Sequence, residues 1–186
     1  MTRNIAEPDK ILSEEIVKTY VKDGQMRVDA ANGGVFLFTR EGQNVLYSAK
    51  TKAVYFYTDK LYKNFPEFKT DETKYVATGE SAALGEVEVE IFEAESEKFK
   101  AQYWVTYDKK FEAFVRSVRE IIQKSKAFYS YSPRETPWLK DDGFDVQTHQ
   151  LRGDKIVDTE FLSLEEKELD KFLFEIPKGY AEFNIP

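Results

Sequence analysis

The first third of the chain is a series of short apolar runs, each ended by residues that favour tight turns. Asp23-Gly24, Asn32-Gly33-Gly34, Glu41-Gly42 and Lys50-Thr51-Lys52 separate neighbouring runs. Glycine and asparagine readily adopt the positive φ angles of hairpin turns, so this spacing predicts consecutive antiparallel strands that form a meander. The predicted strands are Ile11–Lys22, Met26–Ala30, Val35–Arg40, Val45–Ser48 and Ala53–Thr58.

Two of these strands are apolar on both faces. The segment Val35–Phe38 reads Val-Phe-Leu-Phe, and Val54–Tyr57 reads Val-Tyr-Phe-Tyr. A strand with one face in water would alternate apolar and polar side chains. Another part of the chain must therefore cover the second face, or that face lines a cavity for a ligand. The sequence leaves both interpretations open.

An amphipathic helix is the natural candidate for this cover. Between Phe111 and Ile122, apolar residues recur at spacings of three and four, which predicts a helix with one apolar side. These residues are Phe111, Phe114, Val115, Val118, Ile121 and Ile122. A basic amphipathic helix can also bind a membrane surface, but a large aromatic sheet that needs cover favours packing in the core.

The later part of the chain contains two further predicted strand pairs. Glu86–Ile91 alternates three glutamates with three β-branched residues, which predicts a strand whose glutamates face solvent rather than a bound cation. Its predicted partner is Ala101–Tyr107. Phe144–Leu151 and Lys155–Leu162 then form a predicted hairpin around an Arg-Gly-Asp turn.

Two irregular segments complete the predicted organisation. Residues 128–142 hold Tyr129, Tyr131 and Trp138 in a stretch without a helix or strand pattern. Long irregular loops are often lids over binding sites, and the alternative is a loop packed over one end of the sheet. Near the C-terminus, Phe172, Phe174 and Ile176 are predicted to anchor the chain in the core.

The composition excludes several kinds of chemistry. The chain of 186 residues has a formal charge of −7, which argues against nucleic-acid binding. It has no cysteine and one histidine, so thiolate chemistry is excluded and histidine-dependent catalysis is improbable. We find no phosphate-binding glycine loop, nucleophile elbow or HExxH sequence. We therefore expect no catalytic residue, metal site or cofactor, and a carboxylate-based enzyme is the third hypothesis.

Neither a membrane-spanning segment nor a secretory signal is evident in the sequence. No stretch approaches the ~20 apolar residues of a spanning helix. The first residues, Met1 to Pro8, contain no apolar run of the kind found in a signal peptide. A cytosolic protein and a protein whose signal has been removed both fit this start.

Several motifs, taken in order, resemble an uncharacterised bacterial family whose members are often lipoproteins or periplasmic proteins. They begin with Tyr20-Val21-Lys22-Asp23-Gly24-Gln25-Met26-Arg27-Val28 and end with Leu173-Phe174-Glu175-Ile176-Pro177-Lys178-Gly179-Tyr180. Between these lie Val54–Tyr57 with Tyr62, Thr78-Gly79-Glu80 with Leu84-Gly85, Tyr103–Thr106 and Asp142–Val146. The chain departs from the family in lacking the lipobox cysteine at its start.

That family is similar in architecture to the lipoprotein carriers of the LolA/LolB and RseB group. The resemblance implies an α+β, mainly β fold: a strongly curved antiparallel half-barrel wrapped around one main amphipathic helix, with an apolar cavity. It implies a single domain over residues 1–186, with 1–10 and 181–186 peripheral. It also implies a periplasmic or cell-envelope location.

The leading hypothesis is therefore non-enzymatic binding or carriage of a lipid, an acyl chain or an acylated protein. The alternative is an envelope interaction domain with a filled core. The candidate residues for the cavity or its lid are Phe36, Phe38, Tyr55, Tyr57, Trp104, Phe114, Val118, Tyr129, Tyr131 and Trp138.

Overall fold

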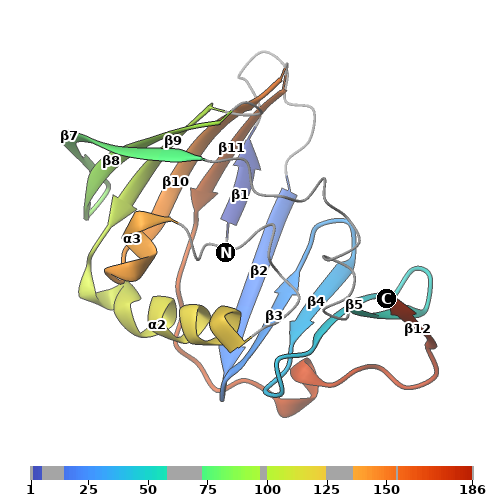
Figure 1. Ribbon diagram of the computed structural model, residues 1–186. Helices are drawn as coiled ribbons and strands as arrows, with labels where there is room; N and C mark the ends of the chain where they lie inside the picture. The colour runs from blue at the N-terminus through green and yellow to red at the C-terminus, as the bar shows by residue number, and fades with distance from the viewer. Residues whose placement is uncertain are drawn as a thin grey trace. The chain divides into compact units, whose positions relative to one another are not determined.

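The computed structural model describes residues 2–5, 15–57, 73–96, 100–124, 136–153 and 155–185 (Figure 1). The chain divides into two compact units that interleave along the sequence. Unit 1 comprises Met1–Ile16, Thr70–Arg116 and Glu135–Leu164, and unit 2 comprises Val17–Lys69, Ser117–Arg134 and Glu165–Pro186. The expectation of a single domain stays a prediction.

Unit 1 is built on an antiparallel sheet, here called sheet A. Its strand order is β1-β11-β10-β9-β8-β7. The strands are β1 (Thr2–Ile5), β7 (Lys74–Leu84), β8 (Val87–Glu95), β9 (Lys100–Thr106), β10 (Phe144–Arg152) and β11 (Lys155–Phe161). The pairing of β8 with β9 and the hairpin of β10 with β11 confirm the sequence predictions.

Unit 2 is built on a second sheet, here called sheet B. Its order is β12-β6-β5-β4-β3-β2. The strands are β2 (Glu15–Lys22), β3 (Gln25–Asp29), β4 (Gly34–Phe38), β5 (Asn44–Ser48), β6 (Ala53–Tyr57) and β12 (Ala181–Ile185). Strands β2 to β6 form the predicted antiparallel meander, whereas β12 lies parallel to β6 at the edge.

The predicted helix is α2 (Lys109–Lys124), and the boundary between the units falls within it. Asp108 begins it, because its Oδ1 accepts the backbone N–H of Lys110 at 2.9 Å. In unit 1, Phe111 and Val115 pack with Val89 and Val146 in one buried cluster. Two further short elements are α3 (Pro137–Lys140) and the 3₁₀ turn η3 (Lys171–Phe174). None of the described helices has both the length and the apolar character needed to cross a membrane.

Strand β4 shows how both of its apolar faces are covered within unit 2. Val35 and Leu37 belong to a cluster against which Ile176 and Tyr180 of the C-terminal segment pack. Phe36 and Phe38 alternate with them and pack in the cluster of Met26, Ile121 and Ile122. The second half of α2 thus packs on one face of β4 and the C-terminal segment packs on the other.

The fold is α+β and mainly β, as predicted, but two details differ from the sequence analysis. The long edge strand β7 was not predicted, because Lys74–Leu84 lacks alternation. Phe174 is buried and Ile176 packs on the core, but Phe172 is 63% exposed, so its predicted anchoring role is wrong. Residues Ala181–Ile185 form β12 at the edge of sheet B, and their expected peripheral place stays a prediction.

Candidate functional site

One face of sheet B carries a row of aromatic and apolar side chains that are not fully buried. Phe36 pairs with Leu46, Leu46 with Tyr55, and Tyr55 with Phe183, so the four residues cross four adjacent strands. Directly paired residues point to the same side of a sheet, and Tyr57 follows Tyr55 by two positions on that side. We call these five residues the aromatic face.

Solvent reaches every member of the aromatic face. Phe36, Leu46, Tyr55 and Tyr57 are partly exposed, and Phe183 is 46% exposed. The rings of Tyr55 and Phe183 stack, with centroids 5.3 Å apart and planes inclined by 21°. Burial, together with the nearby Tyr55 phenol, raises the pKa of Tyr57 above its ordinary value. The face therefore combines solvent access with locally apolar surroundings.

The second half of α2 covers only part of this face. Phe38, at 7% exposure, packs with Ile121 and Ile122, while Phe36 and Val118 border the same cluster. The four buried clusters of described residues do not include Leu46, Tyr55 or Tyr57. Four of the ten predicted site residues, Phe36, Phe38, Tyr55 and Tyr57, thus share one face of sheet B.

The predicted aromatic residues of unit 1 are packed into its core. Trp104 and Phe114 pack against the cluster around Phe111 and Val115. Trp138 is 2% exposed and belongs to a different cluster. The centroid of its ring lies 4.7 Å from the ring centroid of Tyr103, 5.1 Å from that of Phe92 and 5.6 Å from that of Tyr75. Tyr129 and Tyr131 lie outside the described residues, so the lid stays a prediction.

A carboxylate beside Trp138 was not singled out from the sequence. Asp145 of β10 stands at a bulge, where the pairing with β9 shifts between Asp145 and Gln147. Solvent reaches its side chain, but the surrounding protein desolvates the carboxylate and raises its pKa from 3.8 to about 6. Hydrogen bonds from its own backbone N–H and from the Trp138 side chain oppose this rise. Asp145 is a single carboxylate near the start of a predicted strand, so no sequence signal marked it.

The raised pKa predicts that Asp145→Asn stabilises the protein at high pH. An acid whose pKa is raised by folding costs stability once the pH exceeds its unfolded value, and the cost is complete above the folded value. With solvent access taken into account, we expect a gain of about 1 kcal/mol, or about 2–4 °C in Tm, at pH 8. The gain should vanish near pH 4. Thermal melts of both proteins from pH 4 to 8 test this, and parallel curves would contradict it.

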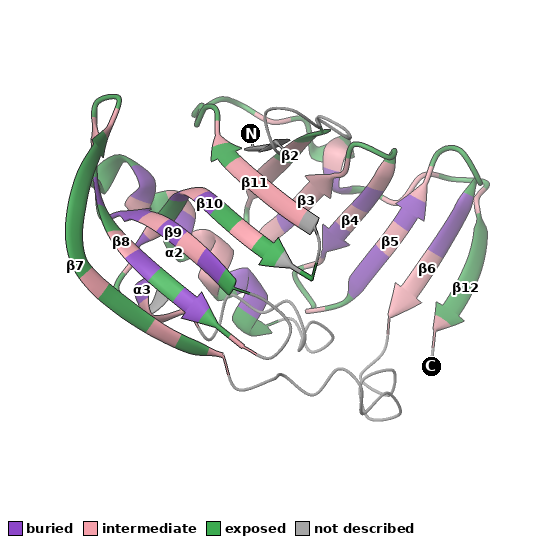
Figure 2. Ribbon diagram, turned by 90° about the horizontal axis from the view of Figure 1, so that it is seen from above, coloured by how far each residue is buried: buried purple, intermediate pink, exposed green. Residues whose placement is uncertain are grey.

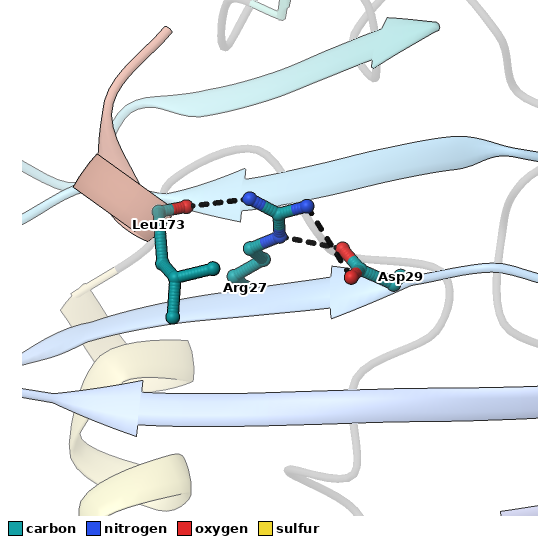
Figure 3. Close-up of polar contacts among 3 residues, drawn as sticks. All are labelled: Arg27, Asp29 and Leu173. Carbon is teal, nitrogen blue, oxygen red and sulfur yellow. Dashed lines mark hydrogen bonds and ion pairs between the residues drawn. The ribbon is translucent and has the colours of Figure 1, made fainter. Parts of the chain in front are cut away.

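In unit 2, a hydrogen bond from Arg27 of β3 attaches the C-terminal segment to sheet B, and Asp29 of the same strand pairs with the Arg27 guanidinium. The Arg27 guanidinium donates Nε–H to Asp29 Oδ1 at 2.5 Å and Nη1–H to the Leu173 carbonyl at 2.9 Å (Figure 3). Leu173 lies in η3, whose Asp170 cap accepts the Phe172 N–H at 3.0 Å. These contacts support a structural role for Arg27.

Among the described residues, neither the single histidine nor the glutamates of the alternating segment belong to a group that could hold a metal ion. His149 Nδ1 lies 2.5 Å from Asp158 Oδ1 on the neighbouring strand, at a side-chain exposure of 48%. Glu86, Glu88 and Glu90 are exposed, as the alternating pattern predicted. Within the described ranges, no group of three or more histidine or acidic residues could hold a metal ion.

Comparisons with known proteins bear on the fold alone. No protein family and no curated protein matches the chain. Solved structures that resemble it include PNGF-II in two crystal forms, in space groups P21 and C2. Each aligns with a TM-score of 0.51 and 14% identity over 99% of this chain, but over only 31% and 30% of the PNGF-II chain. The chain is thus similar in fold to PNGF-II and spans less than a third of its length.

Proposed function

We propose that the protein binds an apolar ligand without catalysis, and that the aromatic face of sheet B is the contact surface. The observation that carries the proposal is the partial exposure of four aromatic side chains and Leu46, which together span four adjacent strands of one sheet. Soluble proteins bury most of their large apolar side chains, so an aromatic row open to solvent favours a binding surface.

The chemical class that suits this surface is an acyl chain, either of a lipid or of an acylated protein. Each methylene removed from water contributes about 0.8 kcal/mol, so micromolar affinity, about 8 kcal/mol, requires an alkyl chain that buries about ten methylenes. The only polar atoms that the five side chains offer are the hydroxyls of Tyr55 and Tyr57. Such a surface discriminates poorly between headgroups and favours long alkyl chains.

The proposal also includes a specific architecture, the LolA-type half-barrel, and a location in the cell envelope. A half-barrel of the LolA type, curved around α2, would place the aromatic face on its inner side. Within unit 2, the packing of Ile121 and Ile122 of α2 with Met26 and Phe38 supports an aromatic face that is turned toward the helix. An envelope location follows from the sequence resemblance.

Native mass spectrometry of the purified protein, followed by organic extraction, tests the proposal directly. We expect a stoichiometric mass excess that extracts as fatty acid or phospholipid. A fluorescent fatty acid, titrated into delipidated protein, should bind with micromolar affinity. The bare mass of the chain, together with no uptake of the fluorescent probe, would contradict the proposal.

A matched pair of phenylalanine variants locates the contact. Phe183→Ala should weaken binding of the fluorescent fatty acid about five- to tenfold, because one ring of the stacked pair is lost. Phe172→Ala removes a ring of similar exposure from η3, which packs with the opposite face of the sheet, and should leave binding unchanged. Equal effects of the two variants would exclude the aromatic face as the contact surface.

An interaction domain with a filled core is the second candidate function. The near-complete burial of Trp138 and Phe38, both predicted as cavity or lid residues, favours it. The two candidates differ in one measurement, since a filled core takes up no fluorescent fatty acid under any condition that keeps the protein folded.

A further inference from the structure

Strand β7 ends sheet A and has β8 as its one strand neighbour among the described strands. It is 11 residues long, and each of its residues is exposed or only partly buried (Figure 2). The outer side of an edge strand presents backbone N–H and C=O groups that can pair with another chain. Natural proteins protect such edges with charges, prolines or bulges, so an unprotected stretch is informative.

A bulge divides β7 into a protected and an unprotected half. The pairing with β8 shifts between Ala77 and Ser81, and Gly79 between them has a φ of +79°. The first half begins with Lys74, a charge of the kind that blocks edge pairing. The second half, Ser81–Leu84, reads Ser-Ala-Ala-Leu and has no charge, no proline and no bulge. This half is the free edge.

The side chains of the free edge and of its β8 partners differ in polarity between the two faces of the sheet. On one face, Ser81 pairs with Glu90 and Ala83 pairs with Glu88. Both glutamates are exposed, and neither forms an ion pair within the part of the chain that the structure describes. On the other face, Leu84 and its partner Val87 pack on the apolar cluster of Phe111 and Val115. The free edge is therefore acidic on one face and apolar on the other.

We propose that the Ser81–Leu84 edge accepts a β-strand of another protein whose side chains alternate between basic and apolar. Strands lie about 4.8 Å apart, so a residue of the added strand lies about 10 Å from Glu88 or Glu90, with Ser81 or Ala83 between them. A lysine or arginine side chain of the added strand is long enough to extend over Ser81 or Ala83 and approach the glutamate on β8. The apolar residues of the added strand extend the surface formed by Leu84 and Val87. Backbone pairing supplies affinity, and the alternation supplies specificity.

The same charges argue against a second copy of this chain as the partner. If the β7 edges of two copies paired, Glu88 and Glu90 of both copies would lie on the same face of the joined sheet, on either side of the two β7 strands. The protein has a net charge of −7. Like charges across an interface are unfavourable, so the complementary partner is basic.

The test uses a fluorescent eight-residue peptide of alternating lysine and valine, measured by anisotropy with the full chain at low salt. Glu88→Gln/Glu90→Gln should weaken binding at least tenfold. Glu166→Gln/Glu168→Gln changes the net charge equally in unit 2, at exposed positions, and should weaken it less than twofold. Equal losses in the two variants would reduce the interaction to non-specific attraction and overturn the proposal.

N-methylated peptides separate strand pairing from charge attraction. Methylation of alternate amides blocks the hydrogen bonds of one edge of the peptide and leaves every charge in place. Of the two possible sets, one should abolish binding and the other should preserve it, because only one edge of the peptide faces β7. Unchanged binding of both methylated peptides, or no binding of the unmodified peptide at millimolar concentration, would overturn the proposal.

Discussion

Replacing Trp138 by alanine is expected to lower the free energy of unfolding by about 3–5 kcal/mol, the range for the loss of a large aromatic side chain from a core. The indole is 2% exposed and contacts the rings of Tyr75, Phe92 and Tyr103. It also hydrogen-bonds to the Asp145 carboxylate. Its removal leaves a cavity and deprives Asp145 of a donor, and these costs add. Urea unfolding followed by circular dichroism measures the loss.

The same variant decides between the two roles that the sequence left open for Trp138. A lid residue would lose affinity for the fluorescent fatty acid and cost less than about 1 kcal/mol of stability. A core residue would lose stability and keep its affinity as long as the protein is folded. Trp104→Ala is the matched control, since Trp104 is also in unit 1 but only partly buried, and we expect a smaller loss of stability.

The sequence predicted those elements whose patterns are local. The turns Asp23-Gly24, Asn32-Gly33-Gly34 and Glu41-Gly42 mark the ends of strands, and Gly24, Gly33 and Gly42 all adopt positive φ. The apolar spacing of three and four in α2 and the alternation in β8 needed no distant partner to be recognised. The two apolar faces of β4 predicted that the second face is either covered by another segment or lines a cavity, because a strand with one face in water would alternate apolar and polar side chains.

What the sequence did not predict depends on contacts between distant segments. Strand β7 lacks alternation because most of its side chains are exposed on both faces, so its β-structure depends on pairing with β8. Trp138 lies in a segment without periodicity, and its burial depends on three rings from β7, β8 and β9. The high pKa of Asp145 arises from the same packing. The aromatic face was predicted in part, through Phe36, Tyr55 and Tyr57, but Phe183 joins it only because β12 pairs with β6.

The attachment of the C-terminal segment through Arg27 gives the second large expected effect. The Arg27 and Asp29 side chains are 17% and 29% exposed, so their ion pair is shielded from water, and Arg27 also donates to the Leu173 carbonyl. Arg27→Met leaves both acceptors without this donor and should cost about 2–3 kcal/mol. Hydrogen exchange of the segment from η3 to Tyr180 should accelerate, because Ile176 and Tyr180 pack on the core that this contact helps to hold.

Arg40→Met is the matched control for Arg27→Met. Arg40 lies 3.3 Å from Asp23, but the two side chains are 57% and 60% exposed, and such surface pairs contribute little. We expect a loss of less than about 0.5 kcal/mol and no change in hydrogen exchange at η3. The double variant Arg27→Met/Asp29→Asn should recover part of the loss, because it removes the shielded carboxylate charge that Arg27→Met leaves unpaired. A loss for Arg27→Met no larger than for Arg40→Met would show that apolar packing alone holds the segment on sheet B.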